Sequence, residues 1–517
     1  MCGFVGYINK EKDKKDNIKK MADLIAHRGP DSEGYYTDEN IALGFRRLSI
    51  IDLNNGSQPI YNEDKSKVII FNGEIYNFEP LREDLIKKGH TFTTKTDTEV
   101  ILHGYEEYGE KILDKLRGMF AFVIYDKNTK ELFAARDFYG IKPFYYAKMG
   151  NTFIFGSEIK SFLIHPHFKK QLNSKMLEYY LTFQYSPGNE TFFKNVYKLM
   201  PGHYLKYKNG KLEVKKYYEI KFKEDKTKTY DEWKKGIKQR LADSIKAHKI
   251  SDVEVGSFLS SGVDSSFIAA SSDVDKTFTV GFNNEKYSEI SYAKDLSEKI
   301  NTQNISKVIT KEEYFKKLPN IIYYMDEPVA DPSAIALYFV TELASENVKV
   351  SLSGEGADEI FGGYNIYQEP LTDAWYYKLP YPIRFVIGKV ASIFPHKRGI
   401  NFLIRRGKKL EDRFVGNAFI FNNHEVKKIL KNKRQTKGFQ DLTKPYYEKV
   451  KDKDEVTKMQ YIDFNFWLIG DILTKADKMS MANSLEVRVP FLDRPLIDYA
   501  LGLPTEFKTD KNTTKKI

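Results

Sequence analysis

The chain has 517 residues, 41% of them hydrophobic, with 82 Lys and Arg against 71 Asp and Glu. Because a single hydrophobic core stops growing at about 250 to 300 residues, this length predicts two domains. One cysteine excludes a disulfide framework, and the sequence contains neither a membrane-spanning apolar run nor a signal peptide, so we expect a cytoplasmic protein with no membrane partner. The net charge of +11 comes from lysines interleaved with acids, which favours a solvated surface over a nucleic-acid groove.

The first part of the chain alternates short β-rich runs with turns. These runs are VIIFNGEIYNF, MFAFVIYD, ELFAARD, FYYAK and TFIFGSE, with helical patterns in EPLREDLIKKG and TEVILHGYEEYG. Closely spaced runs of this kind predict antiparallel sheets with inserted helices. The stretch EVKKYYEIKFKEDKTKTYD then loses periodicity and gains charge, which predicts a domain boundary near residue 215.

The rest of the chain has a different pattern. In YDEWKKGIKQRLADSIKAHK, residues Trp233, Ile237, Leu241 and Ile245 recur every fourth position, which predicts an amphipathic helix. The runs EVGSFLSSGVDSSFIAAS and VKVSLSGEGADE each combine an apolar strand, a small-residue loop and a helix start. Strands that alternate with helices predict a parallel sheet.

Two loops of this second part carry candidate chemistry. In SSGVDSS, residues 260–266, backbone N–H groups at a helix start favour a phosphate, and Asp264 would then need a cation such as Mg²⁺ beside it. The alternative is a serine-rich helix N-cap. The second loop carries Glu355, Asp358 and Glu359, whose alternative is a solvated first helical turn. Because ligands of open parallel sheets lie beyond the carboxyl ends of the strands, we expect both loops to share one crevice.

A third stretch, DILTKADKMSMANSLEVRVPFLD, places Lys475, Lys478 and Arg488 among small and apolar residues. A cation in this setting can neutralise a phosphate or a developing charge. The alternative is a core-packed helix whose lysines extend outward to water.

The lone cysteine directly follows Met1. Removal of Met1 would give Cys2 a free α-amine, whose usual pKa of about 7.7 to 8.0 lies close to the thiol's value of about 8.5, so the amine could serve as the base. The alternative is a small buried hydrophobic side chain.

The stretch FNGEIYN contains Asn72 and Gly73, a pair typical of a type I′ hairpin, although the same groups could donate to an oxyanion. Arg47 could bind a carboxylate and Asp97 an ammonium group. Together with Cys2, these residues are complementary to a free α-amino acid that carries a reactive acyl group.

At this point the chain resembles a known family. MCGFVGYI, HRGPDSEGYY, RRLSIIDL, FNGEIYN, KTDTEV, LRGMFAFVIYD and RDFYGIKPFYY occur in the order found in class II glutamine amidotransferases, and LSSGVDSS, SGEGADEIFGGY, DKMSMA and EVRVPFLD continue it. Nearly the whole chain is similar to glutamine-hydrolysing asparagine synthetases. The resemblance implies an α+β domain over residues 2–215, a four-layer αββα sandwich of the N-terminal-nucleophile hydrolase type. It implies an α/β domain over residues 216–517, a parallel sheet like that of adenine nucleotide alpha-hydrolases, with extra helices.

The resemblance also implies roles for residues. Cys2 would form a glutamyl thioester and release ammonia, and the glutamine-binding residues would be Arg47, Asn72, Gly73, Glu74 and Asp97, with Asn72 and Gly73 also catalytic as the oxyanion hole. The ATP-binding residues would be Leu259, Ser260, Ser261, Gly262, Val263, Asp264, Ser265, Ser266, Val280, Ser353 and Gly354. ATP and Mg²⁺ would convert aspartate to β-aspartyl-AMP and PPi, and ammonia would displace AMP; Glu355 and Lys478 would be catalytic, and Asp264 and Asp358 would hold the metal.

Several alternatives stay open. The acceptor could be another carboxylate, such as diaminopimelate in cell-wall precursors, or the chain could be a non-catalytic glutamine- or nucleotide-sensing module. A β-lactam synthetase is less favoured because that branch has lost the N-terminal nucleophile. The family suggests a homodimer, and relatives usually continue beyond TTKKI, so the second domain is expected to be shortened.

Overall fold

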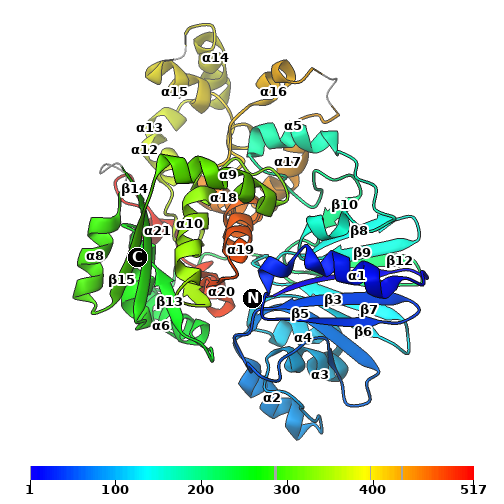
Figure 1. The fold of residues 1–517 in the computed structure, drawn as a ribbon. Coiled ribbons are helices and arrows are strands. Elements are labelled where there is room, and N and C mark those ends of the chain that lie inside the picture. The colour runs from blue at the N-terminus through cyan, green and yellow to red at the C-terminus, as the bar shows by residue number, and fades with distance from the viewer. Residues whose placement is uncertain (1, 284–287, 396, 432–434) are drawn as a thin grey trace.

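The computed structural model describes residues 2–283, 288–395, 397–431 and 435–517 (Figure 1). Among the helices in these ranges, none combines the length and the apolar character that a bilayer-spanning segment needs. The sheets of the first half lie on one side of the molecule and the parallel sheet of the second half on the other, with α19 (Leu473–Ala482) between them (Figure 1).

The first half contains two six-stranded antiparallel sheets. One sheet has the order β10-β8-β9-β1-β3-β2, formed by β1 (Gly3–Ile8), β2 (Ser32–Thr37), β3 (Ile41–Arg47), β8 (Tyr145–Met149), β9 (Thr152–Gly156) and β10 (Val196–Lys198). The other has the order β12-β11-β7-β6-β5-β4, formed by β4 (Ile60–Tyr61), β5 (Lys67–Ile75), β6 (Gly118–Asp126), β7 (Glu131–Arg136), β11 (His203–Lys208) and β12 (Lys211–Lys216).

Helices cover the outer faces of both sheets. Because side chains alternate along a strand, Phe4 points between the sheets while Val5 faces α1 (Lys14–Asp23) with Ile18. On the far side, α2 (Phe78–Lys87) and α3 (Thr98–Tyr108) pack on the second sheet through one apolar cluster. The layers confirm the αββα prediction, and the two helices match the patterns in EPLREDLIKKG and TEVILHGYEEYG. Short α4 (Ile112–Lys115) and α5 (Ser174–Phe183) complete this half.

The second half is built on a five-stranded parallel sheet of order β15-β14-β13-β16-β17. Its strands are β13 (Val255–Phe258), β14 (Lys276–Phe282), β15 (Gln303–Ile309), β16 (Val350–Leu352) and β17 (Glu486–Arg488). The helices around it are α6 (Tyr230–His248), α7 (Val263–Ser272), α8 (Ile290–Lys299), α9 (Lys311–Met325) and α10 (Ser333–Ser345). The predicted parallel sheet is confirmed, and so is the amphipathic helix α6, which a Thr229 and Glu232 capping box begins.

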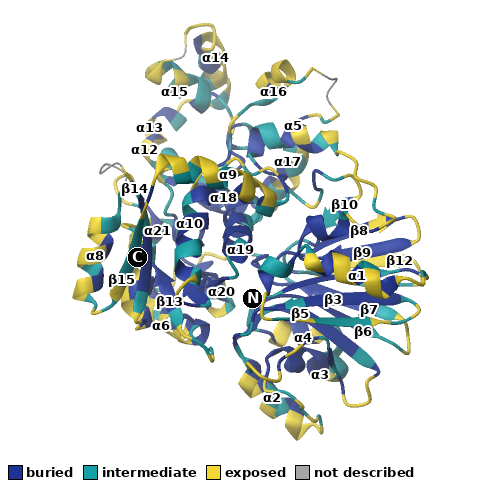
Figure 2. Cartoon of the chain, in the orientation of Figure 1, coloured by how far each residue is buried: buried dark blue, intermediate teal, exposed yellow. Residues whose placement is uncertain are grey.

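Further helices follow, as the α/β prediction with extra helices implies. They are α11 (Ala357–Phe361), α12 (Glu369–Thr372), α13 (Ala374–Tyr377), α14 (Tyr381–Ala391), α15 (Arg398–Arg406), α16 (Asn423–Ile429), α17 (Gln440–Lys449), α18 (Glu455–Asn465), α20 (Arg494–Ala500) and α21 (Thr505–Lys508). Helix α19 is almost wholly buried, as its dark colour in Figure 2 shows. Its Asp477 and Lys478 lie in ion-pair contact with Arg28 and Glu158 of the first half, so the helix connects the two halves through its side chains.

Candidate functional site

The Cys2 pocket lies where β1 begins beside β5. It is lined by Cys2, Arg47, Leu48, Ile50, Ile51, Gly56, Gln58, Phe71, Gly73, Glu74, Thr96, Asp97, Thr98 and Glu486. Asn72 adjoins it, because the backbone N–H of Cys2 donates to Asn72 Oδ1 at 3.1 Å. The structure thus gathers all the residues predicted to act on glutamine around one thiol.

Asn72 and Gly73 lie within β5, paired with Ala121 and Phe120 of β6. The hairpin interpretation of this pair is therefore wrong, because the strand continues through it. Position 73 still requires glycine, since a Cβ at this residue would lie 2.1 Å from the carbonyl oxygen of Met119. Among the described residues, the buried Nδ2 of Asn72 has no hydrogen-bond partner, which leaves a donor available beside the thiol.

Burial dominates the electrostatics of this pocket. It raises the pKa of the Cys2 thiol above its usual value and that of Asp97 to about 7. Burial and the nearby charge of Asp97 raise the pKa of Glu74 well above its usual range. Asp97 is held by the Ile75 backbone N–H, which donates to its Oδ2 at 2.9 Å. An ammonium group placed here would favour the ionised form of both acids.

The sequence analysis missed Glu486, which enters the Cys2 pocket from β17 of the other half. Its Oε1 lies 2.6 Å from Arg488 Nε, and Arg488 Nη2 lies 3.0 Å from Glu74 Oε2. Arg488 is fully buried and also donates to the carbonyl oxygens of His248 and Ile250 at 2.8 and 2.6 Å. The motif EVRVPFLD, which contains Glu486 and Arg488, was the sequence signal for this connection between the halves. The motif could not show that Glu486 reaches the Cys2 pocket, because that depends on the pairing of strands distant in sequence.

The nucleotide cleft opens at the carboxyl ends of β13 and β16. These strands pair directly in parallel, so the loops after them lie side by side, as predicted. The cleft is lined by Leu259, Ser260, Ser261, Gly262, Asp264, Ser265, Val280, Ser353, Gly354, Glu355, Asp358 and others. Val263 and Ser266, also predicted, lie in the first turn of α7 and are not part of the lining.

The serine N-cap alternative fails at this loop. Gly262 occupies the N-cap of α7, and no side chain caps it. The serine hydroxyls instead hold the loop together, with Ser260 Oγ 2.8 Å from Ser265 Oγ and the Ser260 N–H donating to the same oxygen at 3.1 Å. Gly262, Asp264 and Ser265 at the start of α7 line the cleft, where a helix N-terminus favours a phosphate.

The carboxylates of the cleft sit in two groups. Asp264 and Asp358 both form an ion pair with Lys515, whose Nζ lies 2.7 Å from Asp358 Oδ1. A single ammonium group thus bridges the two carboxylates. Burial raises the pKa of Glu355. Burial by itself would lower the pKa of Lys475, but the negative charges of Asp471 and Glu355 raise it. Lys475 is the α19 lysine that lines the cleft.

Lys478, predicted to be catalytic, lies elsewhere. It is almost fully buried one turn further along α19, with Nζ 2.8 Å from Asp326 Oδ2 and 3.8 Å from Glu158 Oε1. It lines a cavity at the contact of the two halves and not the nucleotide cleft. The alternative in which the α19 lysines extend outward to water is wrong for both residues, because Lys475 and Lys478 are buried in ion pairs.

Comparison with known proteins assigns the chain to a family. A model described as glutamine amidotransferase domain matches residues 1–218, and one described as asparagine synthase matches residues 236–517. The chain belongs to the asparagine synthase family. Within this family, Asparagine synthetase [glutamine-hydrolyzing] 1 of Bacillus subtilis (strain 168) is 45% identical over 100% of this chain and 83% of that protein.

Two further relatives agree with this assignment to the asparagine synthase family. Putative asparagine synthetase [glutamine-hydrolyzing] of Mycobacterium tuberculosis (strain ATCC 25618 / H37Rv) is 39% identical over 100% of this chain and 84% of that protein. Asparagine synthetase [glutamine-hydrolyzing] 3 of B. subtilis is 32% identical over 100% of this chain and 83% of that protein. The family predicted from the motifs is confirmed.

Proposed function

We propose that this enzyme makes asparagine from aspartate, ATP and glutamine, with release of glutamate, AMP and PPi. The observation that supports the proposal is that the residues predicted to bind glutamine lie close to Cys2. They do so in a chain that is 45% identical along its whole length to a glutamine-hydrolysing asparagine synthetase. The nucleotide cleft supports the second half of the reaction. We place the enzyme in the cytoplasm, acting as a homodimer, in line with the family.

In the first half reaction, Cys2 Sγ attacks the side-chain amide carbon of glutamine. The Cys2 nitrogen, a free α-amine once Met1 is removed, takes the thiol proton and returns it to the departing ammonia. Asn72 Nδ2, buried and without a partner among the described residues, donates to the tetrahedral oxyanion. Water then cleaves the thioester to give glutamate. Asp97 binds the α-ammonium of glutamine and Arg47 its carboxylate.

In the second half reaction, the aspartate side-chain carboxylate attacks the α-phosphorus of ATP and PPi leaves. Ammonia then attacks the acyl carbon of β-aspartyl-AMP and AMP leaves. The loop of residues 260–266 holds the phosphates, and Lys475 places a cation beside Glu355 at the same cleft. Lys478, buried at the contact of the halves, stays a predicted catalytic residue whose contribution needs a separate test.

A divalent cation fits the acidic pair of the cleft. Asp264 and Asp358 are close enough to share the single ammonium of Lys515, so their oxygens can also bind one metal ion. We propose that these two carboxylates hold Mg²⁺, which supplies charge neutralisation to the triphosphate when bound.

The test measures AMP and PPi release with ATP and Mg²⁺, with aspartate or diaminopimelate as acceptor and glutamine or ammonium as nitrogen source. The wild type is expected to release AMP with aspartate and either nitrogen source. Cys2→Ala is expected to work with ammonium alone, because only the thioester step is removed. Aspartate-dependent ATP/PPi exchange provides a readout of adenylation by itself.

Three outcomes would contradict the proposal in different ways. AMP release with diaminopimelate but not aspartate would change the acceptor. Glutamine hydrolysis without AMP release for either acceptor would leave a glutaminase with a silent second half. Absence of both reactions, with glutamine or ATP still bound, would favour a sensing module.

A further inference from the structure

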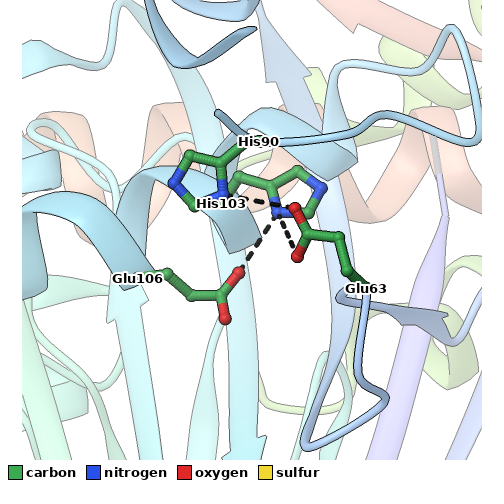
Figure 3. Close-up of side chains that lie close together, drawn as sticks. All are labelled: Glu63, His90, His103 and Glu106. Carbon is green, nitrogen blue, oxygen red and sulfur yellow. Dashed lines mark hydrogen bonds and ion pairs between the residues drawn. The ribbon is translucent and has the colours of Figure 1, made fainter. Parts of the chain in front are cut away.

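Four potential metal ligands converge at the outer edge of the first half and line neither the nucleotide cleft nor the Cys2 pocket. Glu63 lies in the turn between β4 and β5, His90 follows α2, and His103 and Glu106 lie three residues apart on α3, so they share one face of that helix (Figure 3). One ligand atom from each lies within 4.8 Å of all the others. We call this group the α3 cluster.

The spacing of the α3 cluster matches metal coordination. Glu63 Oε1 lies 3.3 Å from His90 Nδ1, and Glu63 Oε2 lies 3.5 Å from His103 Nδ1. His103 Nδ1 lies 3.1 Å from Glu106 Oε2. In a tetrahedral site with ligands at about 2.0 to 2.1 Å the ligand atoms lie roughly 3.3 Å apart. The three contacts are close to this value, and the other pairs of ligand atoms lie within 4.8 Å, so small side-chain shifts would complete such a site. Two imidazoles with carboxylates are ligands that suit Zn²⁺.

The surroundings orient the ligands in the way that metal sites require. The far nitrogen of His103, Nε2, lies 3.5 Å from Oε1 of the buried Glu99, which is the arrangement of carboxylate–histidine–metal triads without their hydrogen bond. Glu106 Oε1 accepts from Asn62 Nδ2 at 2.7 Å, and Glu63 Oε1 accepts from the Thr91 backbone N–H at 3.0 Å. These partners fix the carboxylates while leaving oxygens directed at the imidazoles.

The opposing interpretation is an ion-pair network without a metal, in which a protonated His103 alone joins the carboxylates. That network accounts for His103 and its two acidic neighbours. His90 adds a second imidazole, with Nδ1 3.3 Å from Glu63 Oε1, Nε2 3.9 Å from Glu107 Oε2 and its ring 5.0 Å from the ring of His103. The convergence of two imidazole nitrogens and two carboxylate oxygens within 4.8 Å of one another is the observation that favours a metal site.

We propose that Glu63, His90, His103 and Glu106 bind a divalent transition-metal ion, with Zn²⁺ as the best match. The site is independent of the function proposed above. It adjoins the Cys2 pocket through α3, because Glu99 accepts hydrogen bonds from the backbone N–H groups of Thr93 and Thr94 at 2.8 and 2.7 Å, just before the pocket residues that begin at Thr96. A bound ion would therefore stiffen the segment that leads into the pocket.

The test uses full-length, untagged protein in a Cys2→Ala background, so that the lone thiol cannot bind the metal. After chelator treatment and desalting, Zn²⁺ affinity is measured by competition with a chromophoric chelator, and Co²⁺ absorption reports the geometry. His90→Asn and Glu63→Gln spare the fully buried His103 and should leave the fold intact, as circular dichroism will verify. His424→Asn, on α16 and exposed, is the matched control.

The parent and the control are expected to bind one Zn²⁺ each, with a tetrahedral Co²⁺ spectrum. His90→Asn and Glu63→Gln are expected to bind at least tenfold more weakly, because each removes a ligand. Equal affinity of parent, His90→Asn and Glu63→Gln would overturn the proposal. So would affinity lost equally in His424→Asn, since binding would then lie outside the α3 cluster. Failure of the glutaminase or synthetase assays would leave this result unaffected.

Discussion

The buried guanidinium of Arg28 offers a sharp test of how the two halves hold each other. Its Nη1 lies 2.8 Å from Glu158 Oε1 and 2.8 Å from Asp477 Oδ2, and its Nη2 lies 3.0 Å from Asp477 Oδ1. Its Nε donates to the Cys2 carbonyl oxygen at 3.2 Å. One side chain thus connects the residue that carries the nucleophile to helix α19 of the other half.

The substitution Arg28→Met keeps the length of the side chain and removes the charge. Arg28 is fully buried, and the side chains of Glu158 and Asp477 are 1% and 4% exposed, so both ion pairs of Arg28 are buried salt bridges. Breaking such a pair from one side costs about 3–5 kcal/mol, because an uncompensated charge stays in the interior. Glu158 keeps Lys160 as a partner, so most of this cost should arise at Asp477.

The assay is urea denaturation followed by tryptophan fluorescence and by circular dichroism. The tryptophans all lie in the second half and report its unfolding; they are Trp233, Trp375 and Trp467. Arg46→Met is the matched control, because Arg46 pairs with the exposed Glu33 and Asp23 and such surface pairs are worth about 0–1 kcal/mol. The double variant Arg28→Met/Asp477→Asn should recover part of the loss, since the stranded carboxylate is gone.

The reasoning would be refuted if Arg28→Met cost no more than Arg46→Met. It would also be refuted if the double variant were destabilised by the full sum of its single variants, because the two residues would then act independently. A second readout is the ratio of asparagine formed to glutamine hydrolysed, which should fall in Arg28→Met if the pair positions the two sites.

Three further predictions concern the Cys2 pocket. Asn72→Ala should lower kcat for glutamine hydrolysis by about 10²–10³-fold, because it removes an oxyanion donor, and should leave ammonia-dependent synthesis unchanged. An equal loss of activity with glutamine and with ammonium would contradict this prediction. Burial raises the pKa of Asp97 to about 7, and its carboxylate binds an ammonium group only when ionised. KM for glutamine should therefore rise about tenfold for each pH unit once the pH is well below 7. If KM of Asp97→Asn changed with pH by the same slope, a group other than Asp97 would control glutamine binding. Gly73→Ala should abolish glutaminase activity and lower the melting temperature, because the alanine Cβ would lie 2.1 Å from the Met119 carbonyl oxygen. An unchanged melting temperature would mean that β5 and β6 can move apart at this position.

The sequence patterns predicted the kinds of sheet, whereas the four layers came from the family resemblance. Closely spaced β-rich runs indicated antiparallel sheets, and the recurrence of apolar residues at every fourth position after Trp233 identified α6. The Asn72-Gly73 pair misled one interpretation, since turn propensity is local whereas β5 is held by its pairing with β6 across nine residues. The domain boundary near residue 215 stays a prediction, although the described chain has neither helix nor strand from 217 to 229.

The candidate sites were predictable where a motif is contiguous and unpredictable where strands distant in sequence meet. Cys2 and the loop of residues 260–266 stood out as short patterns. Glu486 did not, because only the pairing of β16 with β17 brings it to the Cys2 pocket. The α3 cluster was missed for the same reason: its spacing of His103 and Glu106 is visible in the sequence, but the approach of Glu63 is not.

The contact between the halves uses charge where apolar packing would give more stability. Buried ion pairs roughly break even against hydrophobic replacements, so Arg28–Asp477, Lys160–Asp326 and Arg488–Glu74 are poorly explained as stabilisers. Their directional hydrogen bonds instead admit one relative placement of the halves, because any shift leaves a buried charge unpaired. Cys2 and α19 are both tied to that placement. The same argument predicts that replacing the Arg28 and Asp477 pair by two apolar residues would preserve folding while weakening the coupling of glutamine hydrolysis to synthesis.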